Sequence, residues 1–187
     1  YSKLDLILSS KAVETVVITG DLKHEFGVIN DTEWKNIKKI IELSLEKSKN
    51  LIIIKGNHDV TLPYITRKKG IELLDYYTSG DLFICHGDEI IENKDFEKSR
   101  IIIMGHEHPA IGLREKSKYE NYKCFLKGKY LDKTLIVLPS FNPLTIGTDI
   151  LKNKLLSPFL KQDLSNFEAY IVEKDNVYSF GKLKNVN

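Results

Sequence analysis

The sequence predicts an α/β fold with a mixed sheet system, and three observations favour this class. Five short apolar runs are continuous and rich in β-branched residues, so they suit buried strands and are too short for helices. A long amphipathic segment separates the first two runs, as in a right-handed strand–helix–strand unit with parallel strands. Further segments place turn residues between apolar stretches, which is typical of antiparallel hairpins.

The predicted elements follow in chain order. The strands are expected at 16–18, 51–54, 82–84, 101–104 and 135–138. A helix is expected from an N-cap at Asn30 or Asp31, and its apolar face is marked at helical spacing by Trp34, Ile37, Ile41 and Leu45. A second helix is expected over 2–12. Hairpins are expected over 71–86 and 169–180, and between 123–130 and 134–138.

Composition excludes several classes of protein. The 187 residues suit a single domain over 1–187, and the net charge of +2 does not favour a dedicated nucleic-acid binder. Two cysteines, Cys85 and Cys124, cannot form a disulfide framework, so a reducing compartment is expected. Neither a signal peptide nor a membrane-length apolar run is visible. We therefore expect a cytoplasmic protein that does not use a membrane.

Polar residues cluster directly after four of the predicted strands. The segments are Gly20-Asp21-Leu22-Lys23-His24, Gly56-Asn57-His58-Asp59, Cys85-His86-Gly87-Asp88 and Gly105-His106-Glu107-His108, which hold all five histidines. In an open α/β sheet, ligands bind at the carboxyl ends of strands. Carboxylate, amide and imidazole groups together suit divalent transition metals such as Mn, Fe or Zn. Two such ions about 3.5–4 Å apart can clamp a displacement at phosphorus.

These segments resemble four of the five motifs of the calcineurin-like metallophosphoesterases. The longer forms GDLKHEFG, GHEHPAIG and LPSFNPL are more narrowly similar to archaeal SbcD-related phosphoesterases. The resemblance implies a two-sheet mixed β-sandwich flanked by helices. The family's opening Asp-x-His motif has no match here, so we expect a domain that lacks its first strand and is incomplete at the N-terminus.

The resemblance also implies an activity and a set of residue roles. It implies hydrolysis of phosphodiesters by hydroxide activated between two divalent ions, with Mn²⁺ favoured and Fe, Zn or Ni as alternatives. The implied metal ligands are Asp21, which bridges both ions, Asn57, His86 and His106 at the second ion, and His108 at the first. His58 is implied to contact the substrate phosphate, with Asp59 orienting its ring. The substrate is a phosphate ester, with nucleotides or nucleic acid among the candidates.

Other functions and other residues stay open. A phosphomonoesterase, a nuclease of the same superfamily and a non-catalytic metal-binding scaffold are the alternatives to a phosphodiesterase. His24 either lines the substrate cleft or hydrogen-bonds a loop. We expect Cys85 in the core, and we expect His106 and His108 to point the same way on an extended strand, with Glu107 facing away and having no role.

The stretch 114–133 is rich in lysine, arginine and aromatic residues. Cations interleaved with aromatic rings are found in proteins that bind single-stranded nucleic acid. The same alternation is natural in a strand that has a solvated face. We favour the second interpretation, a hairpin with a solvated lysine face.

Overall fold

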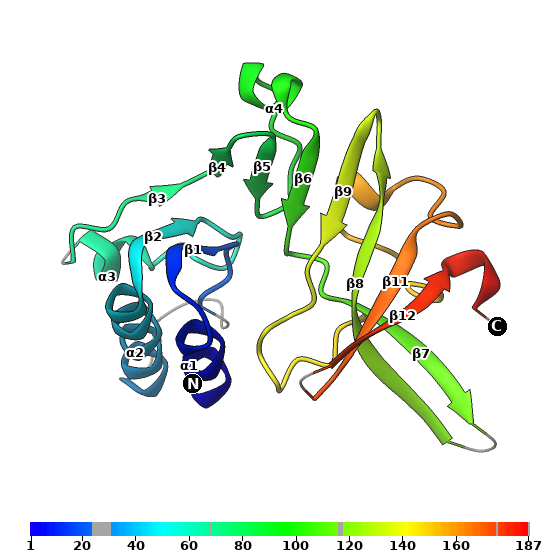
Figure 1. Ribbon diagram of the computed structural model, residues 1–187, viewed down its shortest axis with the longest axis horizontal. Helices are drawn as coiled ribbons and strands as arrows, with labels where there is room; N and C mark the ends of the chain where they lie inside the picture. The colour runs from blue at the N-terminus through cyan, green and yellow to red at the C-terminus, as the bar shows by residue number, and fades with distance from the viewer. Residues whose placement is uncertain (24–30, 68, 116–117, 175, 187) are drawn as a thin grey trace. The chain divides into compact units, whose positions relative to one another are not determined.

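The computed structural model describes residues 1–23, 31–67, 69–115, 118–174 and 176–186 (Figure 1). The chain divides into two compact units, Tyr1–Tyr77 and Thr78–Asn187, and each is described by itself. Both are built from strands and helices, so the predicted α/β fold with mixed β-sheets and flanking helices is confirmed. A single domain over 1–187 stays a prediction.

The first unit contains a three-stranded parallel sheet. Its strands are β1 (Val13–Ile18), β2 (Ser48–Ile54) and β3 (Leu73–Leu74), in the order β1-β2-β3. Its helices are α1 (Ser2–Ser9), α2 (Asp31–Lys47) and α3 (Pro63–Arg67). The chain runs β1, α2, β2, and the two strands pair in parallel, so the predicted strand–helix–strand unit is confirmed.

The core of the first unit lies between α2 and the sheet. Ile37 and Ile41 of α2 pack with Leu51 and Ile53 of β2. The predicted helix face is wrong at Leu45, which is 44% exposed. With 100° of rotation per residue, Leu45 lies about 80° around the helix from Ile37 and outside the buried stripe. The predicted first helix is also shorter than expected, because α1 ends at Ser9.

The second unit is built around a mixed sheet that has nine strands within the described residues. Its path runs in the order β10-β7-β8-β9-β6-β5-β4, and β11 pairs with both β8 and β12. The bounds are β4 (Tyr76–Ser79), β5 (Leu82–Cys85), β6 (Ile101–Met104), β7 (Pro109–Glu115), β8 (Lys118–Tyr130), β9 (Lys133–Val137), β10 (Thr148–Asp149), β11 (Glu168–Glu173) and β12 (Asn176–Lys182). One α-helix, α4 (Lys94–Lys98), and two 3₁₀ helices, Pro158–Leu160 and Leu183–Asn185, complete the described elements.

The strands that carry the histidine segments are parallel. β5 pairs with β6, and β6 pairs with β9, both in parallel register. The predicted hairpins are present as β4–β5, β8–β9 and β11–β12. β7, a further antiparallel partner of β8, was not predicted. Its residues Pro109–Glu115 include proline, glycine and two charged side chains, and only one of them is β-branched.

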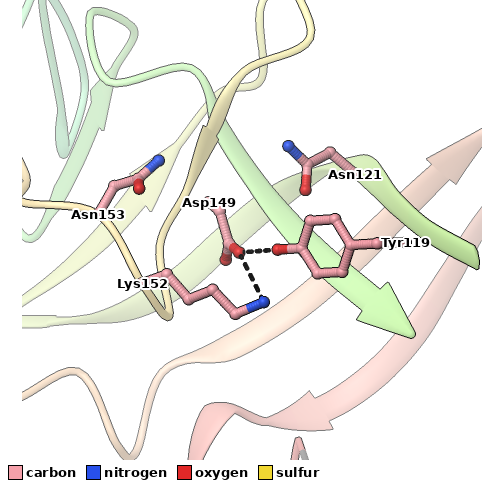
Figure 2. A pocket seen from close by; sticks show the side chains of 5 residues that line it. All are labelled: Tyr119, Asn121, Asp149, Lys152 and Asn153. Atoms are coloured by element: carbon pink, nitrogen blue, oxygen red, sulfur yellow. Dashed lines mark hydrogen bonds and ion pairs between the residues drawn. The ribbon is translucent and has the colours of Figure 1, made fainter. Parts of the chain in front are cut away.

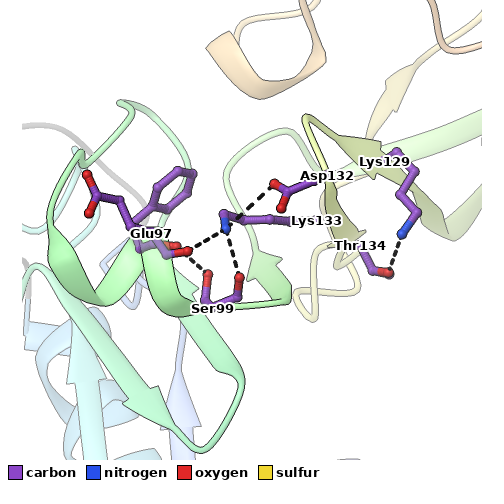
Figure 3. Close-up of polar contacts among 7 residues, drawn as sticks. Glu97, Ser99, Lys129, Asp132, Lys133 and Thr134 are labelled. Carbon is purple, nitrogen blue, oxygen red and sulfur yellow. Dashed lines mark hydrogen bonds and ion pairs between the residues drawn. The ribbon is translucent and has the colours of Figure 1, made fainter.

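The prediction of a solvated lysine face is correct for only part of the stretch 114–133. Lys127 and Lys129 are exposed, whereas Lys133 is only 5% exposed. The Lys133 ammonium donates hydrogen bonds to the carbonyls of Glu97, at 3.0 Å, and Ser99, at 2.8 Å (Figure 3). This lysine therefore ties the start of β9 to the end of α4. Within the described part of the chain, no helix combines the length and the apolar character needed to cross a membrane.

Candidate functional site

In the first unit, the segments after β1 and β2 meet through Asp21. The backbone N–H of His58 donates to Asp21 Oδ1 at 3.0 Å. Gly56 permits this approach, because a Cβ at position 56 would overlap the Asp21 carboxylate and come within 2.9 Å of its Cγ. The carboxyl ends of β1 and β2 thus place Asp21 beside the Asn57–His58 pair, as the sequence predicted.

Asp59 is a fully buried carboxylate that joins the same two segments. Its Oδ1 accepts from the backbone N–H of Lys23 and its Oδ2 from that of Gly56, each at 3.0 Å. Burial raises the pKa of Asp59 above its usual value, and the backbone donors partly oppose that shift. The carboxylate thereby fixes the geometry of both loops. Its predicted role in orienting the His58 ring stays a prediction.

In the second unit, two imidazoles lie against each other. The strands β5 and β6 end in register at Cys85 and Met104, so His86 and His106 follow from one edge of the sheet. The backbone N–H of Gly105 donates to the His86 carbonyl at 3.0 Å. His86 Nε2 lies 3.1 Å from His106 Nδ1, and the ring planes are 72° apart. The two predicted ligands are therefore neighbours.

The two ring nitrogens are hydrogen-bonded to each other in this structure, with the donor set by the tautomer, and their spacing also suits a shared transition-metal ion. Two nitrogens bound at about 2.1 Å and separated by an angle between octahedral and tetrahedral values lie about 3.0–3.4 Å apart. The observed separation of 3.1 Å falls in that range. His86 is 3% exposed, so few water molecules can compete for its ring nitrogen. The donor set of this pair fits a divalent ion such as Mn, Fe or Zn.

The loop that carries His106 and His108 is not an extended strand, so the prediction for this segment is wrong. β6 ends at Met104, and both histidines have a left-handed backbone, with φ of 56° and 51°. Gly147 packs against this loop, because a Cβ at 147 would overlap the carbonyl oxygen of His108. The backbone, rather than strand alternation, sets where the two rings point.

Glu107 has a structural role, so the prediction that it has none is wrong. Its side chain is buried, and Oε2 accepts from the backbone N–H groups of Leu156, at 2.8 Å, and Ser157, at 2.9 Å. The Ser157 hydroxyl donates in turn to the Gly87 carbonyl at 2.6 Å. Burial raises the pKa of the Glu107 carboxyl. The loops after β5 and β6 are therefore connected through segment 156–157, which no local sequence pattern indicates.

The remaining predicted residues have different outcomes. His24 lies outside the described residues. Asn57 is exposed, and His58 is half-buried. Cys85 is in the core as expected, and burial raises the pKa of its thiol to about 12.

Comparison with known proteins assigns a family. A family model described as calcineurin-like phosphoesterase matches residues 1–151. The comparison with curated proteins gives no match.

Several solved structures are similar to the chain at low identity. Vps29 from Chaetomium thermophilum is 16% identical with a TM-score of 0.47, over 96% of this chain and 86% of that chain. Vacuolar protein sorting 29 from Cryptosporidium parvum is 14% identical with a TM-score of 0.45, over 97% and 89%. A single-mutant form of Vps29 from Entamoeba histolytica is 14% identical with a TM-score of 0.44, over 96% and 87%.

Proposed function

Because this chain belongs to the calcineurin-like phosphoesterase family, we propose that it is a metal-dependent phosphoesterase that hydrolyses phosphodiester bonds. The observation that carries the proposal is the pair of imidazoles at the carboxyl ends of β5 and β6, with ring nitrogens 3.1 Å apart. In the first unit, the Asp21 and His58 segments hold oxygen and nitrogen donors at the ends of two parallel strands. Donors of these kinds suit metal-assisted phosphoryl chemistry.

The metal ligands are those that the family resemblance assigns. They are Asp21, Asn57, His86, His106 and His108, with Mn²⁺ the preferred ion and Fe, Zn or Ni the alternatives. A divalent ion polarises the phosphoryl oxygen and lowers the pKa of water.

His58 is the residue that we assign to the substrate. Its backbone N–H donates to Asp21, and it directly follows the assigned ligand Asn57 in the chain. There it contacts the phosphate and either donates a proton to the leaving oxygen or stabilises the developing charge. Asp59 holds the surrounding loops through two backbone hydrogen bonds.

The substrate class within the family is a narrower part of this proposal. The segments GDLKHEFG and GHEHPAIG favour an SbcD-like subtype, and with it a nucleotide or nucleic-acid substrate. We also place the protein in the cytoplasm, because Cys85 and Cys124 are both free thiols.

A second candidate is a scaffold that binds metal without hydrolysis. Both candidates use the same assigned ligands, so measured turnover is what distinguishes them.

The test is a substrate panel assayed with Mn²⁺. Bis(p-nitrophenyl) phosphate, p-nitrophenyl phosphate, a cyclic nucleotide and single-stranded DNA distinguish diesterase, monoesterase and nuclease activity. Asp21→Asn and His106→Ala should abolish most turnover and reduce the bound metal, measured by elemental analysis. Asp132→Asn is the matched control, because this acid is exposed and is not an assigned ligand. Metal binding in the wild type without turnover on any substrate would favour the scaffold.

A further inference from the structure

A polar pocket lies on the second unit, apart from the histidine pair. It has a volume of about 310 Å³ and is lined by residues of β8, β10 and the turn after β10. The lining side chains are Tyr119, Asn121, Asp149, Lys152 and Asn153 (Figure 2). Tyr119 and Asn121 belong to the basic and aromatic stretch 114–133. The hairpin interpretation of this stretch assigns it no function.

Gly112 leaves the space that the Tyr119 hydroxyl and the Asp149 carboxylate occupy. It lies on β7 directly opposite Asn121 of β8. A Cβ at position 112 would overlap the Tyr119 hydroxyl and would lie 2.7 Å from Asp149 Oδ2. Any larger residue there would displace the groups that form the floor.

The floor of the pocket is an assembled group of nearly balanced charge. Asp149 is 3% exposed and accepts hydrogen bonds from the Tyr119 hydroxyl and from the Leu151 N–H, the latter at 3.1 Å. The Lys152 ammonium lies 3.9 Å from the carboxylate and 3.8 Å from the centre of the Tyr119 ring. One anion beside one cation gives little net attraction to a charged ligand. A neutral ligand with hydrogen-bonding groups is favoured.

Two amides flank this floor. Figure 2 shows Asn121 and Asn153 on opposite sides of the Asp149 carboxylate. Within the described residues, Asn121 Oδ1 is buried without a hydrogen-bond partner. Each amide offers a donor and an acceptor side by side, and rotation of the terminal torsion exchanges their positions. An asparagine amide pairs in this way with the edge of a nucleobase, for example with adenine N6 and N7.

We infer that this pocket binds a nucleobase. The pocket is shallow and open to solvent, and three of its five lining residues are exposed, so it suits a small flat group such as a base. The pocket is also close to the histidine loop along the chain, because Thr148, just before Asp149, donates its N–H to the His108 carbonyl at 2.9 Å. Gly112, which contacts two residues of the pocket, lies about 10 Å along β7 from Pro109, the residue that follows His108. The inference goes beyond phosphoester hydrolysis and does not depend on it.

The experiment measures binding of adenosine, which carries no phosphate, to the full chain in the presence of EDTA. Calorimetry or NMR shift changes report affinity, and D-ribose is the control ligand. Adenosine should bind and ribose should not. Asn121→Ala and Asn153→Ala should each weaken binding by roughly tenfold, because each removes hydrogen bonds to the base. Asn185→Ala, at an exposed position of the same unit, should leave the affinity unchanged.

Three results would overturn the inference. They are no adenosine binding, equal affinity in all three variants, and ribose binding as tight as adenosine binding. If Asn121→Ala fails to fold, Asn153→Ala decides, since its side chain is exposed. Hydrolysis of bis(p-nitrophenyl) phosphate is assayed separately, so failure of the base pocket and failure of the proposed phosphoesterase are distinguishable.

Discussion

Three assigned metal ligands have a backbone conformation that residues other than glycine rarely adopt. Asp21, His106 and His108 have φ values of 51°, 56° and 51°. Only two other non-glycine residues in the described ranges share this feature, Leu131 and Lys174. A left-handed backbone costs about 1–2 kcal/mol for most side chains. Such strain is concentrated at functional sites in many proteins, which agrees with the assignment of these residues.

Replacing His108 with glycine should separate stability from activity. His108→Gly relieves the left-handed backbone, so we expect the free energy of unfolding to rise by up to about 1 kcal/mol. Turnover with Mn²⁺ should fall, because an assigned ligand is lost. Leu131→Gly is the matched control, since Leu131 has φ of 54° and is 74% exposed. It should stabilise the protein similarly and keep its activity; a loss of activity in both variants would argue against a ligand role for His108.

Replacing His58 tests its assignment to the substrate. His58→Ala should reduce kcat by about 10²–10⁴-fold, the usual contribution of general acid–base catalysis. The amount of bound metal should stay near that of the wild type, because no assigned ligand is removed.

The leaving group provides the control for that variant. The leaving oxygen of a nitrophenyl ester needs little protonation. His58→Ala should therefore reduce kcat less on a nitrophenyl ester than on an alkyl ester. Equal losses on both esters would leave only charge stabilisation, and loss of metal would make His58 a ligand.

At the scale of elements, the loops after β5 and β6 depend on one buried carboxylate. Glu107 accepts two backbone N–H groups, from Leu156 and Ser157. Glu107→Ala should lower the free energy of unfolding by about 1–3 kcal/mol, because the buried Ser157 N–H and the part-buried Leu156 N–H lose their partner. It should also weaken Mn²⁺ binding, because the loop with His106 loses its support. Glu92→Ala, at an exposed position, should change neither quantity; equal effects of the two variants in urea titrations would refute this role.

Helix α2 gives a second test at this scale. Ile41→Ala should lower the free energy of unfolding by about 2–5 kcal/mol, because Ile41 is fully buried in the core. Leu45→Ala should cost less than about 0.5 kcal/mol, because Leu45 is largely exposed. Thermal or urea unfolding of both variants measures this, and similar losses would place Leu45 in the core after all.

Elements with a strong local pattern were predictable from the sequence, and those fixed by tertiary contacts were not. The strands at 101–104 and 82–84 follow from β-branched apolar runs, and the helix α2 from its periodicity. β7 is a strand because β8 pairs with it, and its own residues carry little strand signal. The burial of Lys133 also depends on carbonyls far away in the sequence.

For the molecule as a whole, the positions of most candidate site residues could be predicted from the order of the four polar segments. Each segment follows a parallel strand, so sheet topology brings Asp21 beside His58 and His86 beside His106. The sequence could not indicate the left-handed loop at 106–108, the role of Glu107 or the pocket opposite Gly112. These features arise from contacts between residues that are distant in the chain.

We propose that this chain hydrolyses phosphodiesters only when a divalent ion is bound. The most direct test is the rate of bis(p-nitrophenyl) phosphate hydrolysis by protein first treated with a chelator and then titrated with Mn²⁺. We predict no turnover before Mn²⁺ is added and a saturable rise afterwards, with His106→Ala showing little turnover at any Mn²⁺ concentration. Turnover that persists in the chelator, or none at saturating Mn²⁺, would contradict the claim.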